Sequence, residues 1–139
     1  MVCLGNICRS PLAEGILQDK LKSTHVKVDS AGTASYHIGS SPDHRSIEVA
    51  ANNGIDISKQ KARAFKTTDF DEFDHIYAMD SQNVADILDK ARNEEDEQKV
   101  QLILKSKDVP DPYYGDIKDF EYVYALLNDA CEEIKSLIT

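Results

Sequence analysis

The chain has 139 residues, of which 41% are hydrophobic and 29% charged, with a formal net charge of −9. This length suits one domain with a sizeable core, and no apolar run is long enough to span a bilayer. The negative charge argues against nucleic acid as a partner, and three cysteines, an odd number, argue against a disulfide scaffold. We therefore expect a cytoplasmic protein that binds neither membrane nor nucleic acid.

The chain opens with the run MVCLGNICRS, in which Cys3 and Arg9 lie six positions apart. Ser10 and Pro11 form a capping signal that predicts a helix from Pro11 onward. The preceding loop would then lie at the positive end of the helix dipole with its N–H groups turned inward, a geometry that binds a tetrahedral oxyanion. The same field favours a thiolate at Cys3, and Arg9 can grip two phosphate oxygens.

Hydrophobic periodicity predicts alternating helices and strands along the rest of the chain. Helices are expected over residues 11–23, 42–53, 68–73, 81–91 and 120–138. Strands are expected at the residues before Cys3 and at 26–28, 75–79 and 100–104. Ser41-Pro42 repeats the capping signal, and residues 94–97 are expected to form a solvated acidic turn.

This alternation implies an α/β fold with a parallel sheet and right-handed crossovers. Ligands of such sheets bind beyond the carboxyl ends of the strands. Cys3 and Asp111, far apart in the sequence, are therefore expected in the same cleft.

Four runs together carry a family resemblance: CLGNICRSP at 3–11, DSAGT at 29–33, MD at 79–80 and DPYYGD at 111–116. They cover essentially the whole chain, which resembles the low-molecular-weight protein tyrosine phosphatases. The resemblance implies a three-layer α/β/α fold of the phosphatase I type, with a central four-stranded parallel sheet of order 2-1-3-4. Residues 1–139 would form one such domain. Its first strand would be truncated at the amino terminus, because relatives carry more apolar residues there.

The resemblance also implies a protein-tyrosine-phosphatase that hydrolyses phosphotyrosine and aryl phosphate monoesters through a phosphocysteine. Cys3 is expected as the nucleophile, Arg9 as the phosphate clamp and Asp111 as the general acid and base. The phosphate would be bound by the loop residues Leu4, Gly5, Asn6, Ile7, Cys8 and Arg9.

Asp111 has an alternative role as a turn residue, because Asp-Pro is common in turns. The neighbouring Tyr113 and Tyr114 favour the catalytic role, since two aromatic rings suit the walls of a pocket for a flat ring. By the family match, neither Asp108 nor Asp116 is the acid.

Four residues are expected to support the loop: Asn6, Ser10, Ser30 and Asp80. Asparagine tolerates the backbone angles of a tight anion loop. Ser10 can donate to the Cys3 sulfur when the phosphocysteine breaks down, or simply cap the helix. In the family, Ser30 and Asp80 belong to the network that holds the loop, although buried polar or capping roles explain them equally well.

The resemblance places five side chains around the substrate pocket: Ile7, Tyr36, His37, Tyr113 and Tyr114. Relatives that act on phosphoarginine tend to have threonine at position 7, so isoleucine favours phosphotyrosine. Family members often pair the second loop cysteine, here Cys8, with the nucleophile in a reversible disulfide that prevents over-oxidation. Cys131 is expected to be a core residue.

Two other functions remain in competition. Arsenate reductases share this loop and fold, but their thiol relay needs two further cysteines, and residues 60–95 contain none. A phosphocysteine carrier would lack the pair of Arg9 and Asp111. No metal is expected, because the third cysteine and the histidines are scattered, and no cofactor is expected. The expected partner is a phosphotyrosine-containing protein, with a tyrosine kinase as one candidate, and the chain is expected to be a monomer.

Overall fold

A computed structural model describes residues 1–139. Its strands are β1 Val2–Cys3, β2 Ala31–Gly32, β3 Ile76–Ala78 and β4 Val100–Leu102. Its helices are α1 Arg9–Lys20, α2 His44–Asn52, α3 Asp69–Glu72, α4 Ser81–Leu88, α5 Glu94–Gln98 and α6 Ile117–Ile138. The four strands are parallel and lie in the order β2-β1-β3-β4, so the predicted sheet is confirmed.

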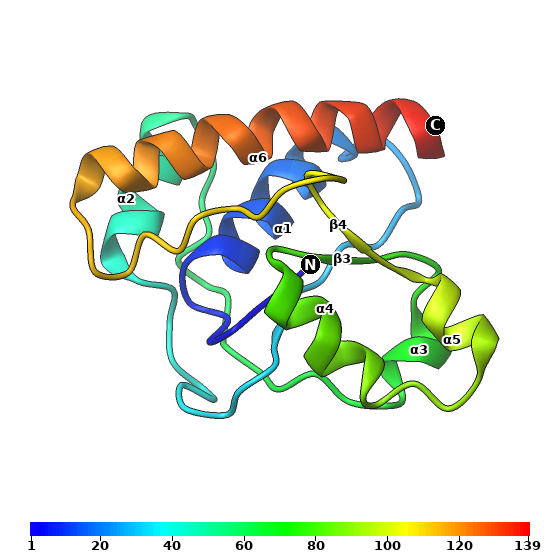
Figure 1. Cartoon of the computed structure of the whole chain (residues 1–139). Helices are drawn as coiled ribbons and strands as arrows, with labels where there is room; N and C mark the ends of the chain where they lie inside the picture. The colour runs from blue at the N-terminus through cyan, green and yellow to red at the C-terminus, as the bar shows by residue number, and fades with distance from the viewer.

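The helices form two layers, one on each side of the sheet (Figure 1). Helices α1, α2 and α6 pack against one another, whereas α4 packs on β3 and β4 and α5 on β4. Leu12, Ile16 and Leu127 belong to the core beneath α1 and α6, and Phe70 and Ile87 belong to the core on the opposite side. The predicted three-layer α/β/α architecture is therefore confirmed.

Strand β1 is central although it has only two residues. Val2 is in register with Ala31 on one side and with Ala78 on the other. The carbonyl of Cys3 accepts a hydrogen bond from Thr33 at 2.9 Å, which carries the pairing with β2 past its last residue. Cys3 thus lies at the carboxyl end of the central strand, the edge at which parallel sheets bind ligands.

The strand predicted at residues 26–28 is wrong. The segment has no sheet pairing, and β2 begins three residues later at Ala31. A strand needs a hydrogen-bonded neighbour, and β1 begins opposite Ala31, so residues 26–28 face no residue of β1. Val26 and Val28 are half-buried because they pack on the main core, whereas Lys27 between them is exposed. The alternation of apolar and polar residues therefore reflects contact with the core and not strand pairing.

Both predicted serine caps are also wrong. Helix α1 begins at Arg9, so Ser10 lies inside the helix, and its hydroxyl contacts the sulfur of Cys3. Helix α2 begins after Asp43, whose carboxylate accepts the Arg45 N–H at 2.9 Å.

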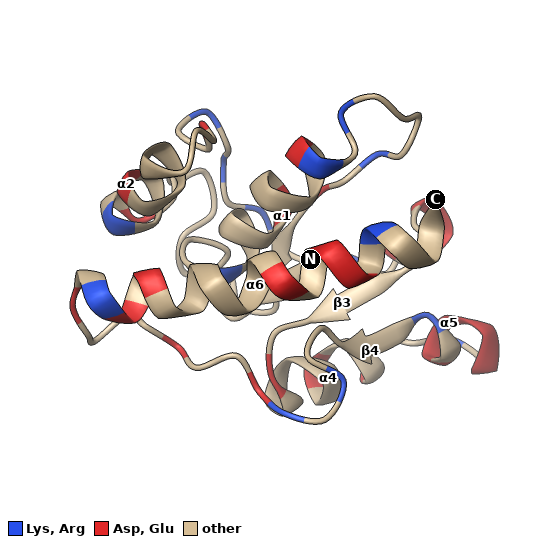
Figure 2. Cartoon of the chain, turned by 90° about the horizontal axis from the view of Figure 1, so that it is seen from above, with Lys and Arg blue, Asp and Glu red and all other residues tan.

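The acidic run at 94–97 is helix α5 and not a turn. The side chain of Asn93 caps it by accepting the N–H of Asp96 at 2.9 Å. Acidic side chains are favourable in a first helical turn because the positive end of the helix dipole lies there. Figure 2 shows further acidic positions, coloured red, along the ribbon of α6.

None of the helices combines the length and the apolar character needed to cross a membrane.

Candidate active site

A cavity of about 330 Å³ opens at the carboxyl end of β1. Three segments meet there: the amino-terminal loop (residues 3–9), the loop around residue 36, and the segment 110–115, which we call the Asp111 loop. The cavity is lined by Cys3, Leu4, Gly5, Ile7, Cys8, Arg9, Tyr36, His37, Asp111, Tyr113 and Tyr114. Four predicted site residues are absent from this lining: Asn6, Ser10, Ser30 and Asp80. Asn6 belongs to the amino-terminal loop, and the other three contact residues of that loop.

The buried sulfur of Cys3 faces two hydrogen-bond donors. The backbone N–H of Asn6 lies 3.3 Å from Sγ, and the Ser10 hydroxyl lies 3.0 Å from it. The side-chain amide of Asn6 also donates to Ser10 Oγ at 2.8 Å. Because an amide nitrogen can only donate, Ser10 accepts there and its own proton is free to point at the sulfur. Both groups can therefore donate a hydrogen bond to the sulfur.

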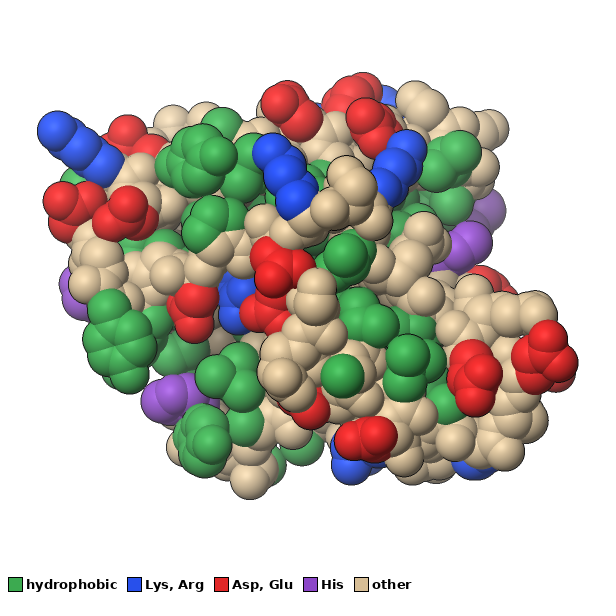
Figure 3. All heavy atoms as spheres, in the orientation of Figure 1, with side chains coloured by type: hydrophobic (Ala, Val, Ile, Leu, Met, Phe, Trp, Pro, Cys, Tyr) green, Lys and Arg blue, Asp and Glu red, His purple; other side chains and the backbone are tan.

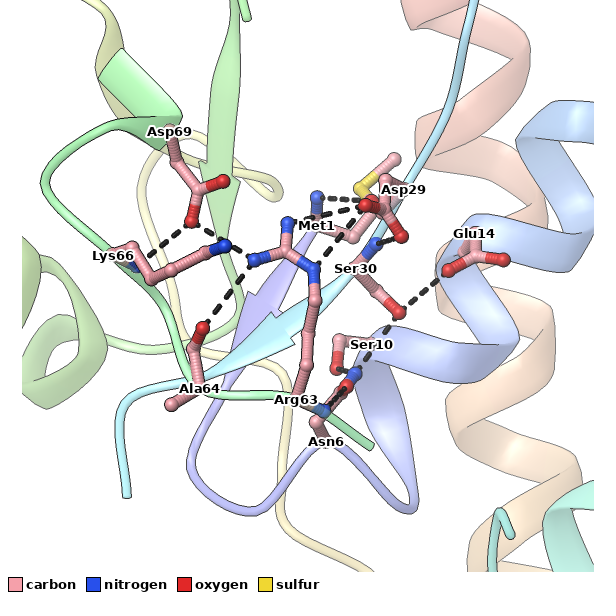
Figure 4. Close-up of polar contacts among 10 residues, drawn as sticks. All are labelled: Met1, Asn6, Ser10, Glu14, Asp29, Ser30, Arg63, Ala64, Lys66 and Asp69. Carbon is pink, nitrogen blue, oxygen red and sulfur yellow. Dashed lines mark hydrogen bonds and ion pairs between the residues drawn. The ribbon is translucent and has the colours of Figure 1, made fainter. Parts of the chain in front are cut away.

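Asn6 holds the amino-terminal loop from behind (Figure 4). It is buried and has a φ of 57°, in the left-handed region that asparagine tolerates better than most residues. Its amide also donates to Ser30 Oγ at 2.9 Å, and its carbonyl accepts the N–H of Arg63 at 3.0 Å. The side chain thereby ties the loop to two distant segments.

Replacing Asn6 with alanine is expected to lower both stability and activity. The part-buried N–H of Arg63 would lose its acceptor, a loss that costs roughly 1–3 kcal/mol where the group is fully buried. Alanine would add strain of about 1–2 kcal/mol at a left-handed φ. Asn6→Gly should relieve only the strain, recovering part of the stability but not the activity. Urea unfolding and turnover of an aryl phosphate would measure both effects, with the exposed Asn52→Ala as control. Wild-type behaviour of Asn6→Ala would refute this role.

The network behind the loop continues to residues that the sequence analysis missed. Ser30 donates to Glu14 at 2.6 Å; burial raises the pKa of Glu14, and this hydrogen bond opposes the rise. The guanidinium of Arg63 lies 3.1 Å from Asp29 and 3.0 Å from Asp69 (Figure 4). Arg63 carried no recognisable signal in the sequence, because it reaches Asn6 through its backbone N–H.

Arg9 is buried beside the cavity and is held on one side. Its Nη1 donates to the Asp80 carboxylate at 2.8 Å and to the carbonyl of Val109 at 2.9 Å. Asp80 also caps α4 through the N–H of Asn83 at 2.8 Å, so its capping and loop-holding roles coexist. Nη2 lies 3.8 Å from Asp111 Oδ2, and Nε has no hydrogen bond within the protein. Its remaining N–H groups are therefore available to an anion in the cavity.

Asp111 lies at the mouth of the cavity, with 45% of its side chain exposed. One carboxylate oxygen accepts the N–H of Tyr113 at 3.1 Å, and the other faces Arg9. The turn role and the position at the cavity therefore coexist. Asp108 binds the first residue of α4 and Asp116 caps α6, so neither lines the cavity.

Aromatic side chains form the rim of the cavity. The rings of Tyr113 and Tyr114 meet edge to face, with centroids 4.9 Å apart, and Tyr36 packs edge to face on His37. Tyr114 and Tyr36 are 95% and 78% exposed. Hydrophobic side chains gather on the left of the face in Figure 3, where Figure 1 places these loops. Such a rim offers apolar walls to a flat ring.

The three cysteines are free and buried. Cys8 lines the same cavity as Cys3, and burial, together with the nearby Asp43 carboxylate, raises the pKa of its thiol. The Cys8 thiol therefore ionises less readily than a free cysteine. Cys131 lies in the core, as expected, where burial raises its pKa to about 12.

The sequence and the fold were compared with those of known proteins. The family model described as low molecular weight phosphotyrosine protein phosphatase matches residues 1–138. The Saccharomyces cerevisiae and human proteins of that name are each 40% identical to this chain. The alignments cover 87% and 88% of this chain, and 82% and 84% of those proteins.

Two solved structures have the same fold, each with a TM-score of 0.90. One is a protein tyrosine phosphatase from Entamoeba histolytica with Hepes in the active site, 39% identical, covering 97% of this chain and 92% of its own. The other is Vibrio vulnificus Wzb in complex with benzylphosphonate, 31% identical, covering 99% and 95%. The chain therefore belongs to the low molecular weight phosphotyrosine protein phosphatase family.

Proposed function

We propose that the chain hydrolyses phosphotyrosine in proteins through a phosphocysteine intermediate. The observation that carries the proposal is the buried Cys3 sulfur, which faces two donors beneath a cavity that Arg9 and Asp111 also line. The benzylphosphonate complex of the Vibrio relative supports an aromatic substrate, because this molecule joins a phenyl ring to a phosphonate group.

In the first step, the thiolate of Cys3 attacks phosphorus. The new P–S bond forms as the bond to the phenolic oxygen breaks, and Asp111 gives that oxygen its proton. Arg9 and the amides of residues 4–9 stabilise the charge on the non-bridging oxygens, while Ile7 and the rim aromatics hold the ring.

In the second step, water attacks the phosphocysteine. The ionised Asp111 takes a proton from this water, phosphate is released, and the electron pair of the P–S bond returns to sulfur as a thiolate. The Ser10 hydroxyl, 3.0 Å from Sγ, donates to the departing sulfur. The cycle therefore consumes one water, which is the nucleophile of the second step, and regenerates the Cys3 thiolate and the protonated Asp111.

The proposal extends to the setting of the enzyme. It describes a cytoplasmic monomer of one domain whose substrates are phosphoproteins, a tyrosine kinase among them. The family likeness and the three free cysteines agree with this setting. A reversible disulfide between Cys3 and Cys8 agrees with their place in one cavity.

Asp111→Asn tests the assignment of the acid. We expect kcat for phenyl phosphate to fall roughly 10²- to 10⁴-fold. The loss for p-nitrophenyl phosphate should be much smaller, since nitrophenolate leaves readily without a proton. Rates across a series of aryl phosphates would measure this, with Asp108→Asn, a nearby carboxylate outside the cavity, as control. An equal loss for every leaving group would contradict the assignment.

Stoichiometric labelling without turnover in the wild type would indicate a phosphocysteine carrier instead of a phosphatase.

A further inference from the structure

The Asp111 loop receives hydrogen bonds from only one side chain elsewhere in the chain. Arg45 donates from Nη2 to the carbonyl of Tyr113 and from Nη1 to the carbonyl of Gly115, both at 2.9 Å. The other hydrogen bonds of residues 110–115 are internal: Tyr113 to the Asp111 carboxylate and Gly115 to the Pro112 carbonyl. The remaining polar link is the 3.8 Å contact between Asp111 and Arg9. Arg45 therefore supplies the side-chain hydrogen bonds that join this loop to the rest of the chain.

Arg45 itself is held firmly. Its Nε and Nη2 donate to the two carboxylate oxygens of Asp43 at 3.0 and 2.9 Å. Its guanidinium carbon lies 4.3 Å from the ring centre of the fully buried Phe120 and 5.9 Å from that of Tyr113. These hydrogen bonds also lower the pKa of Asp43, so the pair stays charged in mildly acidic solution. A planar guanidinium held in this way can fix the positions of the Tyr113 and Gly115 carbonyls.

The segment that carries Arg45 is also bound to the amino-terminal loop. The N–H of Asp43 donates to the carbonyl of Ile7 at 2.7 Å, and the Ser46 hydroxyl donates to the carbonyl of Cys8 at 3.1 Å. Residues 43–46 therefore contact both loops that line the cavity. They fix the separation between the loop that carries the nucleophile and the loop that carries the acid.

We propose that Arg45 is a positioning residue that holds the Asp111 carboxyl over Cys3 for proton transfer to the leaving group. The inference rests on the proposed phosphatase function. Arg45 touches no reacting atom in this scheme, since it is not among the residues that line the cavity. Its loss should impair proton transfer specifically, because small displacements of a catalytic group slow reactions strongly.

Arg45→Met removes the hydrogen bonds and keeps an apolar stem over Phe120. We expect kcat for phenyl phosphate to fall roughly 10- to 100-fold, with KM changed less than threefold. The loss for p-nitrophenyl phosphate should be several times smaller. In the Asp111→Asn background, Arg45→Met should cause no further loss, since the acid it positions is already absent. Lys118→Met is the matched control, because it removes an exposed cation from the first turn of α6.

Arg45→Lys keeps the positive charge but loses the planar guanidinium that reaches both carbonyls. It replaces Arg45→Met as the test if Arg45→Met does not fold. It should show the same dependence on the leaving group. Equal losses for both substrates, or losses that add to that of Asp111→Asn, would overturn the inference and indicate a structural role alone. A wild-type enzyme that is inactive on both substrates would instead refute the proposed phosphatase function.

Discussion

Cys3→Ser is expected to reduce turnover of aryl phosphates by roughly 10⁴-fold or more. A serine hydroxyl is a far weaker acid and a poorer nucleophile than a thiol, even beside the same two donors, the Asn6 N–H and the Ser10 hydroxyl. Arg9 and the loop amides remain, so the affinity for inorganic phosphate should change only a few-fold. Steady-state rates and phosphate binding by calorimetry would measure the two effects.

Cys131→Ala is a suitable control for this variant, because it removes a buried thiol that is not part of the cavity. It should keep the wild-type rate. Full activity of Cys3→Ser would exclude sulfur as the nucleophile.

Arg9→Ala should lower kcat/KM by roughly 10³- to 10⁵-fold, the range for arginines that stabilise a transferring phosphoryl group. It should also destabilise the fold by about 1–3 kcal/mol, because Asp80 and the Val109 carbonyl lose a donor. Arg9→Lys keeps a cation beside Asp80, so much of the stability should return. Activity should stay low, since lysine cannot offer two parallel N–H groups to phosphate.

Denaturant unfolding and kcat/KM for an aryl phosphate would separate the two effects. Arg92→Lys, an exposed arginine paired with Asp71 and Asp96, is the matched control and should leave activity unchanged. Wild-type activity of Arg9→Lys would show that charge alone is sufficient and would contradict a bidentate phosphate clamp.

Short-range signals and a topological rule predicted the alternation of helices and strands, the parallel sheet and the meeting of Cys3 with Asp111. The three layers and the sheet order 2-1-3-4 were expected from the family resemblance. Helical periodicity marks the apolar faces that cover a parallel sheet, and ligand sites of such sheets lie at the carboxyl ends of the strands. The run at residues 3–9 is informative because the backbone of one contiguous loop carries the nucleophile and its donors.

Other features depend on partners that are distant in the sequence. Residues 26–28 alternate like a strand, but the extent of β1 decides which residues can pair. Ser10 has the sequence position of a cap, yet its hydroxyl contacts a sulfur seven residues away. Arg63 and Arg45 act on main-chain groups of remote loops, through a backbone N–H and through two bonds to carbonyls. Side-chain type in the sequence carries no information about such contacts.

Between the two chemical steps the phosphoryl group should reside on the sulfur of Cys3. Wild-type enzyme can be mixed briefly with p-nitrophenyl phosphate, quenched in acid and digested, and the modified peptide identified by mass spectrometry. We expect the phosphoryl group on the peptide that contains Cys3, accompanied by an initial burst of nitrophenolate. A phosphoryl group on another residue, or steady turnover with no labelled Cys3 peptide at any mixing time, would rule out the phosphocysteine route.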